Sequence, residues 1–447
     1  MKYEILMIFI FFIYLIYCER EDEIIKKNNF IITDLIKWAS KNNFTFPSIE
    51  LSSELSPKFV ATKTFEKNET ILIIPNNIMF NISKALKLIS SKNLKNQFER
   101  FKSEEYLYIE YEDEEFKKEE SFLGYILYLM EYRSKKYQKT KFFEEYKYYL
   151  KSLKIKPRTR PLLLDYEDAS KLYMTYANVL YNSIKKDYEE EILIFKGDSY
   201  SKKEIDYEDY IPHRINAQNK GIKINGHKTM VPFLNLFEKD YINYNANYTI
   251  EKDGSIRIFA KKNIQKYEEI IIASPKQSNA RYLLLEGKTY EKLINYYDEY
   301  LLPAFGIAVT NRFDINDPDL EDRYYLNLMD NDFDETAVEW YKDNIDILKD
   351  GNRKENVTSS YGYLYEILLN NLKAYNEYLK NFNSQRIYEY FKEPEIRIHV
   401  ARIVKGESKI LEKAYSFAQK KASKYINLNS VRAEGYNDQE NKINTDL

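Results

Sequence analysis

The sequence predicts an α+β fold in which a β-core is interrupted by a helical insert and followed by an all-helical domain. Strand-like runs of β-branched residues occur before residue 84 and return after residue 210, whereas apolar residues between them recur at helical spacing. Long amphipathic stripes follow from about residue 320 to 425. We therefore expect a β-containing domain at 30–315, its helical insert at about 84–210, and a helical domain at 320–425.

Composition excludes several classes of function. The 447 residues allow two to four domains, and 68 basic against 70 acidic residues leave a net charge of −2, with no basic run to attract nucleic acid. The single cysteine and the three histidines, which are far apart in the sequence, exclude a Cys/His zinc site, a disulfide framework and a Cys–His nucleophile pair. We thus expect neither a metal nor a nucleic-acid partner.

An apolar run, Ile5–Tyr17, lies near the start of the sequence. It is shorter than the roughly 20 residues of a spanning helix, and Ile16 and Cys18 suit the −3 and −1 positions of a cleavage site. We expect residues 1–18 to be a signal peptide that leads the protein into the secretory pathway: the ER lumen, the exterior, or an organelle reached by that route. The alternatives are a buried helix and an uncleaved anchor, and only the anchor would bring the chain to a membrane.

The first elements of the β-containing domain are short. Asp34–Ser40 is typical of a helix that Thr33 caps, after a charged spacer at 19–29. Phe59–Thr62 and Thr70–Pro75 are typical of strands, because β-branched and aromatic residues dominate them and a Pro-Asn-Asn turn ends the second.

The insert is followed by a second group of strands. Within 84–210 the helical spacing is clearest in one apolar set: Phe122, Tyr125, Ile126, Leu129 and Met130. Strands are then predicted around two hairpin-turn dipeptides, Asn225-Gly226 and Asp253-Gly254, and in the run Glu268–Ala273. We detect no internal repeat in the sequence.

Two apolar stripes near the C-terminus are typical of helices in the core of a bundle. The first consists of Leu364, Ile367, Leu368, Leu372, Tyr375 and Leu379, and the second of Ile396, Val400, Ile403, Val404, Leu411, Ala414 and Ala418. The polar tail at 427–447 is expected to be disordered.

Four segments resemble one protein family in the right order. Residues 30–80, with SPKFVATKTFEKNETILIIP, resemble its opening motif G-x-G-L-V-A-T-x-x-I-x-x-G-E-x-I-L-x-I-P, and residues 123–150 resemble a motif of its helical insert. Residues 213–235, with HRINAQNKGIKINGHKTMVPFLN, are similar to its S-R … L-V-P-x-x-D. Residues 254–279 are similar to its G … A-x-x-x-I-x-x-G-E-E-I-x-I-S-Y-G-x-x-S-N. The family is the SET-domain methyltransferases of the Rubisco large-subunit methyltransferase type, a group that includes actin-histidine methyltransferase.

The resemblance implies a SET-domain β-core with a helical insert, followed by a helical domain that binds the protein substrate or partner. It implies transfer of a methyl group from S-adenosylmethionine (SAM) to a protein side chain, mostly lysine, with no metal. The acceptor amine must lose its proton and align with the sulfonium methyl, so positioning supplies much of the rate.

Two SAM-binding segments of the family are substituted here. The glycine loop becomes Ser56-Pro57-Lys58, in which proline has no N–H to donate and lysine adds a bulky side chain. Glu54, just upstream, matches a family acid that contacts SAM, or it is a solvated surface acid. The family's D-L-x-N-H becomes Asn235-Leu236-Phe237-Glu238-Lys239, so both members of the Asn-His pair are lost.

The remaining matches are mixed. Ser274 stands at the catalytic tyrosine of the family, where its hydroxyl cannot reach the place of a phenol. Arg214 matches an arginine that contacts the SAM carboxylate, with a structural ion pair as the alternative. Tyr248 matches a tyrosine that lines the methyl-transfer pocket, although coincidence is an alternative in a chain with 43 tyrosines. Ser278 and Asn279 match the family's S-N, and a helix N-cap explains them equally well.

Two functions from different classes follow. In the first, the protein is a SAM-dependent protein-lysine (or histidine) N-methyltransferase whose catalysis is weak or lost, because three functional segments depart in the same sense. In the second, it is a non-catalytic SET-fold binding or scaffold module of the secretory pathway.

Overall fold

The computed structural model describes residues 23–42, 44, 46, 48–52, 57–104, 114–132, 136–153, 172, 175–196, 205–240, 243–275, 277–290, 299–302, 307–310, 324–327, 332–333, 369–378, 380 and 394–422. The predicted signal peptide at 1–18 and the predicted tail at 427–447 lie outside the described residues. The chain divides into two compact units, residues 1–163 with 184–276 and residues 164–183 with 277–447.

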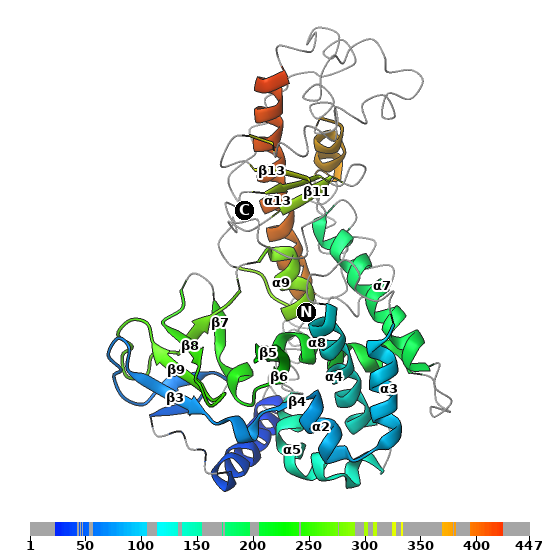
Figure 1. Cartoon of the computed structure of the whole chain (residues 1–447). Helices are drawn as coiled ribbons and strands as arrows, with labels where there is room; N and C mark the ends of the chain where they lie inside the picture. Colours follow the sequence, from blue (N-terminus) through cyan, green and yellow to red (C-terminus); the bar gives the residue numbers. More distant parts are fainter. Residues whose placement is uncertain are drawn as a thin grey trace, which may run out of the picture. The chain divides into compact units, whose positions relative to one another are not determined.

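The first unit contains the β-core (Figure 1). One sheet has the strand order β3-β9-β8-β10-β7, a second has the order β4-β6-β5, and β1 pairs with β2. The strands are β1 Ile49–Leu51, β2 Phe59–Ala61, β3 Thr70–Ile74, β4 Phe80–Asn81, β5 Gly221–Ile224, β6 His227–Met230, β7 Glu238–Asp240, β8 Ala246–Ile250, β9 Ile256–Ala260 and β10 Ile271–Ala273. The strands predicted from the sequence on both sides of the insert are thus confirmed.

Tight turns and one parallel strand determine how this core is connected. Asn225 and Gly226 join β5 to β6 with φ of 50° and 83°, the positive values that a two-residue hairpin turn of the primed type requires. Gly254 has φ of 79° in the turn between β8 and β9. Strand β10 is parallel to both of its neighbours, β7 and β8, so segments that are distant in the sequence meet beside it.

The expectation that the chain has no internal repeat is wrong. Segments 61–73 and 260–272 share the pattern A-x-K-x-x-x-K-x-E-x-I-x-I. Each contains a turn whose positive-φ residue is Asn68 (69°) or Tyr267 (70°). In each turn a glutamate side chain accepts the N–H of the residue three positions earlier, Glu69 at 2.9 Å and Glu268 at 2.8 Å.

The two copies of this repeat pair with each other about a local two-fold axis. The N–H of Asn68 donates to the Ala260 carbonyl at 2.7 Å, and the N–H of Tyr267 donates to the Ala61 carbonyl at the same distance. Ala61 and Ala260 are both fully buried. The repeat escapes sequence analysis because it is short, and because most of its positions require only burial or a turn and not a particular residue.

The described part of the insert is helical, as predicted. Its helices are α2 Ile82–Ile89, α3 Lys92–Lys102, α4 Glu114–Tyr132, α5 Lys141–Ser152, α7 Tyr176–Lys196 and α8 Tyr207–Lys220. Four of them begin at a side chain that accepts a backbone N–H of the first turn, Asn81, Ser91, Thr140 and Asp206. Helix α4 is buried on all sides from residue 120 to 130, which makes it the centre of the insert.

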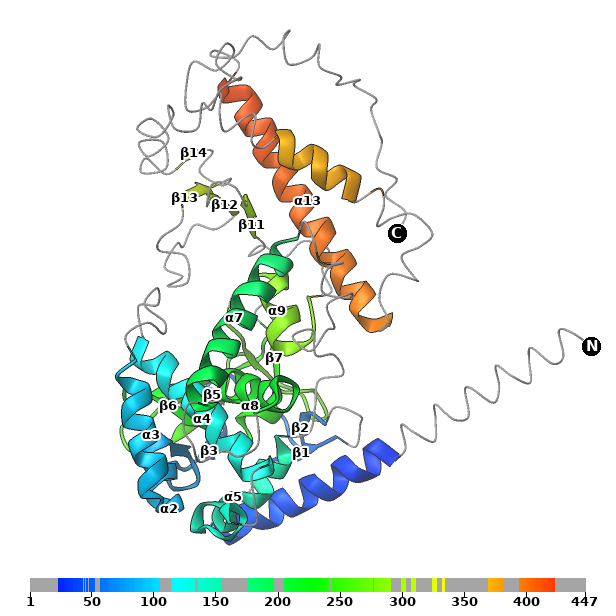
Figure 2. The same ribbon diagram turned by 90° about the vertical axis from the view of Figure 1, so that its right-hand side faces the viewer.

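A helix over residues 23–41 precedes β1 and is longer than the predicted Asp34–Ser40. Thr33 lies inside it and donates its hydroxyl to the carbonyl of Asn29 at 2.8 Å, so the predicted Thr33 cap is wrong. The apolar face continues N-terminally through buried Ile31 and Ile32, which extends the helix. Trp38 attaches the helix to α5, because its Nε1 donates to the carbonyl of Glu145 at 2.6 Å. Figure 2 shows the C-terminal end of the helix beside α5.

The second unit contains helices and a small sheet. Its elements are α9 Asn279–Glu286, β11 Glu299–Leu302, β12 Ile307–Thr310, β13 Tyr324–Asn327, β14 Asp332–Phe333, a helix over 369–378, and α13 Pro394–Ala422. The predicted stripe on α13 is buried from Ile396 to Ala414. Strands β13 and β14 lie inside 320–425, where the pattern predicts helices alone. The aromatic residues of β13 favour extended pairing with β12.

A buried carboxylate joins three helical segments of this second unit. Glu407 of α13 accepts the N–H of Tyr176, the first residue of α7, at 3.0 Å. It also accepts the hydroxyl of Tyr375 at 2.9 Å, from the helix over 369–378. Among the described residues, no helix is long and apolar enough to cross a membrane.

Candidate functional site

The segment 268–274 brings four of the predicted site residues together: Lys58, Glu238, Lys239 and Ser274. It runs antiparallel to β2, where the N–H of Ile270 donates to the carbonyl of Phe59 at 2.9 Å, and continues as β10. Buried Asn245 fixes its path. The Asn245 Nδ2 donates to the carbonyl of Glu269 at 2.7 Å, and the Asn245 Oδ1 accepts the N–H of Ile271 at 2.8 Å.

Lys58, at a glycine position of the family, lies directly before β2. Its Nζ is 3.2 Å from the Glu269 Oε2, in an ion pair whose two side chains are 33% and 29% exposed. Its N–H donates to the Ser52 Oγ at 3.1 Å. The lysine is therefore tied to the segment that leads into β10. Glu54 and Ser56 lie outside the described residues.

Glu238 and Lys239, at the positions of the lost Asn-His pair, lie in β7. They face Ile271 and Ile272 of β10 in a parallel register, and both are half-buried. The Lys239 Nζ donates to the carbonyl of Asn219 at 3.1 Å, in the last turn of α8, where a cation complements the helix dipole.

The backbone before β7 is strained at Phe233, which is fully buried and has φ of 71°. A bulky residue in that region costs on the order of 1–3 kcal/mol and persists only when the surroundings hold it. The aromatic rings of Phe44 and Phe46 do so, with centroids 5.0 and 4.8 Å from the Phe233 ring. The strained residue opens the short 3₁₀ turn Leu234–Leu236, which contains Asn235, whose side chain lies outside the described parts.

Ser274 and Tyr248 are related by the parallel pairing of β10 with β8. Ala246 is the partner of Ile272, and Tyr248 and Ser274 are each two residues further along, so that register puts them on the same face. Ser274 is buried, and its N–H donates to the carbonyl of Asp240 at 3.2 Å. Burial raises the pKa of the Tyr248 phenol above its usual value, so Tyr248 is a neutral hydroxyl at physiological pH.

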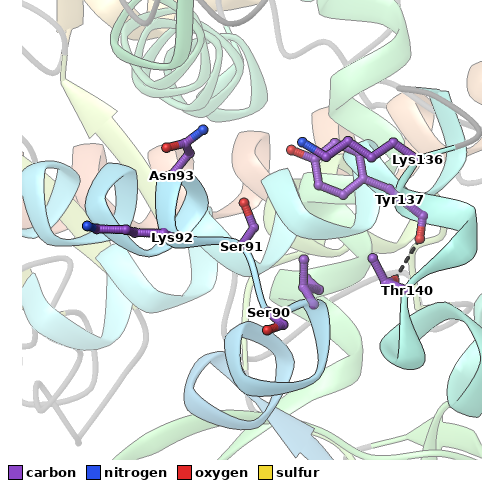
Figure 3. A pocket seen from close by; sticks show the side chains of 8 residues that line it. Ser90, Ser91, Lys92, Asn93, Lys136, Tyr137 and Thr140 are labelled. Atoms are coloured by element: carbon purple, nitrogen blue, oxygen red, sulfur yellow. Dashed lines mark hydrogen bonds between the residues drawn. The ribbon is translucent and has the colours of Figure 1, made fainter.

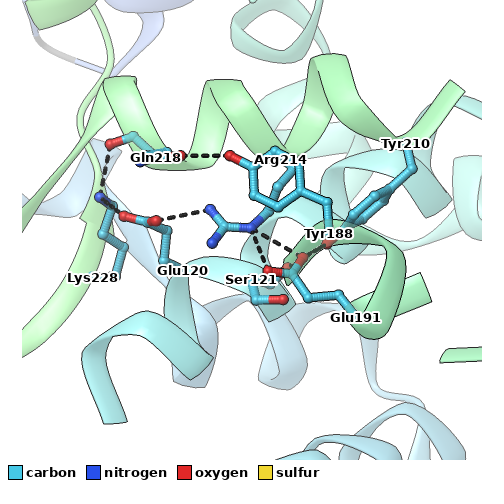
Figure 4. A network of polar contacts seen from close by, with 8 residues as sticks. All are labelled: Glu120, Ser121, Tyr188, Glu191, Tyr210, Arg214, Gln218 and Lys228. Atoms are coloured by element: carbon cyan, nitrogen blue, oxygen red, sulfur yellow. Dashed lines mark hydrogen bonds and ion pairs between the residues drawn. The ribbon is translucent and has the colours of Figure 1, made fainter. Parts of the chain in front are cut away.

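Arg214 lies elsewhere, in a dry polar network between the helices of the insert (Figure 4). Its Nε donates to both carboxylate oxygens of Glu191 at 3.0 and 3.1 Å, and its Nη1 donates to the Glu120 Oε1 at 2.8 Å. All three side chains are at most 3% exposed. The Tyr188 ring lies 4.9 Å from the guanidinium carbon and covers one face of the group.

Further partners complete this network. Lys228 is also buried and donates to Glu120 and to the carbonyl of Gln218, so Arg and Lys balance two carboxylates. Tyr210 donates its hydroxyl to Glu191. Helix α4 approaches α8 so closely that a Cβ on Gly124 would stand 2.9 Å from the Cα of Arg214. The ion-pair interpretation of Arg214 is therefore the one that its contacts support.

Burial raises the pKa of the Glu120 carboxyl, but Lys228 and Arg214 outweigh burial and hold that pKa well below its usual value. Glu120 is consequently ionised at all physiological pH values. A buried carboxylate in this state needs both of its cations, because removal of one partner of a buried pair leaves an uncompensated charge.

Ser278 and Asn279 belong to the second unit and have structural partners there. The Ser278 Oγ accepts the N–H of Arg281 at 3.4 Å and caps α9, which confirms the N-cap interpretation. The Asn279 Oδ1 accepts the N–H of Tyr290 at 2.9 Å. Both residues are 1% exposed.

Sequence reasoning missed the partners that determine how Arg214 is used. Glu120 directly follows Glu119, and Glu191 ends the run Glu189–Glu191, so nothing in the sequence separates these two acids from their more exposed neighbours. One signal was available for Glu120, because it directly precedes the fully buried run 121–130. Asn245 gave no signal, since its role depends on the path of β10.

A pocket formed by described residues lies away from this region (Figure 3). Its volume is about 270 Å³, and it is lined by Ile89, Ser90, Ser91, Lys92, Asn93, Lys136, Tyr137 and Thr140. None of the predicted site residues lines it. Within the described parts of the chain, no group of three or more His, Cys, Asp or Glu side chains is placed to hold a metal ion.

Comparison with known proteins identifies the fold. No protein-family profile and no curated protein matches the sequence. A solved structure of Rubisco LSMT bound to AdoMet matches with a TM-score of 0.58 at 12% identity, over 91% of this chain and 96% of that one. The SET domain of LSMT bound to lysine and AdoHcy matches with a TM-score of 0.56 at 13% identity, over 88% and 92%. The chain therefore has the α+β fold of SET-domain methyltransferase structures of the Rubisco large-subunit type.

Proposed function

We propose that this protein is a member of the SAM-dependent protein-lysine N-methyltransferase family in which catalysis is weak or lost. The observation that carries the proposal is the closed network around Arg214. In the family, the matching arginine contacts the SAM carboxylate, whereas here Glu120 and Glu191 accept from its Nη1 and Nε in a buried environment.

SAM is the cofactor that the fold implies, and the described residues do not fit its carboxylate at Arg214. A third carboxylate would add a negative charge to a buried network in which Arg214 and Lys228 already balance Glu120 and Glu191. The cost of such a change in a buried site is several kcal/mol. The buried glutamates of the insert therefore oppose a contact between Arg214 and the SAM carboxylate.

The strand side of the site supports the same proposal. Ser274 takes the place of the catalytic tyrosine, and Lys58 carries a charged side chain where the family has glycine. Tyr248 is the tyrosine that remains, on the same face of the strands as Ser274, but it belongs to the neighbouring strand β8 and is half-buried. Loss of one preorganised contact typically lowers a rate by about 10²–10³.

The experiment is transfer of radiolabelled methyl groups from SAM to a protein extract, with the chain, its Ser274→Tyr variant and its Ser274→Ala variant. We expect no label above background from the chain or from Ser274→Ala. Label gained by Ser274→Tyr would place the loss at the tyrosine alone. Efficient transfer by the unaltered chain that Tyr248→Phe abolishes would contradict the proposal.

The alternative function is a non-catalytic SET-fold module that binds a protein partner through its C-terminal helical region. The same closed network favours it. If Arg214 is held by internal ion pairs, the fold keeps its packing and its outer surface, which can bind a partner, without binding the cofactor that methyl transfer requires. In both cases we propose that residues 1–18 lead the protein into the secretory pathway. N-terminal sequencing of the purified protein tests this by the presence or absence of Cys18.

A further inference from the structure

The outer face of the helix over residues 23–41 has an unusual composition. Its inner face is buried against the first unit through Leu35, Trp38 and Ala39. The outer face, spaced at intervals of three and four residues, consists of Glu23, Lys26, Lys27, Phe30, Asp34, Lys37 and Lys41. Four lysines against two acids give this face a charge of +2, in a chain whose net charge is −2.

The lysines of this face are available to a partner. All four are exposed, and within the described parts of the chain no side-chain hydrogen bond or ion pair involves Lys26, Lys27, Lys37 or Lys41. By contrast, Lys185 and Lys186 of α7 are paired with glutamates one turn further on. The outer face thus presents cations without a compensating row of carboxylates.

An aromatic ring lies in the middle of these cations. Phe30 is 66% exposed, more than most apolar side chains of the described residues. Ile24 at the start of the helix is 45% exposed. A phenylalanine left in water forgoes the favourable transfer of its ring into an apolar environment. Lysine side chains can extend their charged ends toward headgroups while such a ring enters the apolar boundary below.

The sequence indicates a partner that combines negative charges with an apolar interior, as a lipid bilayer does. The apolar run Ile5–Tyr17 ends five residues before the helix begins, and five residues span at most about 17 Å. Whenever a bilayer holds that run, the helix lies near the bilayer surface. We propose that the outer face of the helix over 23–41 binds anionic lipid headgroups, with Phe30 inserted between them.

The affinity of the face is expected to be modest. Each lysine near an anionic membrane adds a small attraction that salt screens, and one weak signal gives reversible binding. The acids at residues 19, 21 and 22 oppose the attraction at one end. Binding should therefore require a high fraction of phosphatidylserine and weaken at high ionic strength.

The test uses the full chain with a tryptophan at the position in question. The tryptophan fluorescence of the Phe30→Trp variant is measured with vesicles that contain brominated lipids, and the signal of the unaltered chain is subtracted. The bromine atoms quench only a ring that lies inside the bilayer. Leu193→Trp is the matched control, because Leu193 is 65% exposed on α7 of the same unit. We expect quenching at position 30 with phosphatidylserine vesicles and none at position 193.

Charge-reversal variants distinguish the contribution of this face to vesicle binding from that of the apolar run. Lys26→Glu with Lys37→Glu should weaken binding to phosphatidylserine vesicles at least about tenfold, whereas Lys185→Glu with Lys186→Glu should change it less than about twofold. Absence of quenching at position 30 would overturn the proposal. So would equal quenching with neutral phosphatidylcholine vesicles, since that would assign the contact to the apolar run alone.

Discussion

The two regions that the resemblance places around SAM are built in opposite ways. Arg214 lies in a dry network in which every charge has a partner on another element. The segment 268–274, by contrast, is held chiefly by backbone hydrogen bonds and by Asn245, and the side chains of Lys58, Glu238 and Lys239 beside it remain partly exposed. The difference teaches that Arg214 is held by internal partners of the helical insert, whereas the side chains beside the segment 268–274 remain accessible.

The largest predicted effect breaks the closed network. Arg214→Leu leaves Glu120 and Glu191 buried without their shared cation and should lower the free energy of unfolding by about 3–5 kcal/mol. The control is Lys185→Met, which removes an exposed pair on α7 and should change the value by less than about 0.5 kcal/mol. Urea unfolding measures both. Equal small effects would mean that the network is not closed.

Acid unfolding tests the same network through Glu120. Its pKa is about 4.5 in the unfolded chain and well below that in the folded protein, so its stabilisation is complete above pH 4.5 and is lost as the pH falls further. Each proton taken up costs about 1.4 kcal/mol per pH unit. Urea unfolding between pH 5 and 3 should give a shallower slope for Glu120→Gln than for the unaltered chain. Identical slopes would contradict the assigned pairing.

Substitutions in the partly exposed turn that leads into the segment 268–274 should have small effects on stability, and one of them should raise it. Tyr267 is 68% exposed at φ of 70°, and Asn68 has the equivalent place in the repeat. Tyr267→Gly should raise the thermal midpoint, through about 1 kcal/mol of relieved strain, while Asn68→Gly should change little because asparagine tolerates this conformation. If Tyr267→Gly destabilises the protein, the contact of the Lys266 Nζ with the Tyr267 ring, 4.6 Å from its centroid, outweighs the strain.

The smallest effect is expected at Lys58. Lys58→Met removes a partly exposed ion pair with Glu269 and should lower the free energy of unfolding by less than about 1 kcal/mol. A loss as large as that of Arg214→Leu would mean that both regions are equally closed.

Much of the fold follows from the sequence, because burial and turns leave a periodic record. The strands β2, β3 and β10 and the stripe of α13 are predicted for that reason. The N-terminal boundary of the helix over 23–41 is missed, since Thr33 suits a cap but bonds to Asn29 inside a helix. The repeat is missed because its two copies share geometry more than identity.

The site is predicted less completely than the fold. Family motifs locate Lys58, Glu238, Lys239 and Ser274 beside one segment, because the order of strands carries them there. The same motifs cannot say how Arg214 is used, because its partners come from α4 and α7, which are far away in the sequence. A long-range ion pair has no local signature, so only the folded structure decides between a ligand contact and a structural role.

The most direct test of the central claim is isothermal calorimetry of SAM with the full chain. The closed network around Arg214 predicts no measurable binding up to millimolar SAM. Micromolar binding that Tyr248→Phe weakens would contradict the account, because it would mean that the cofactor pocket persists without the arginine.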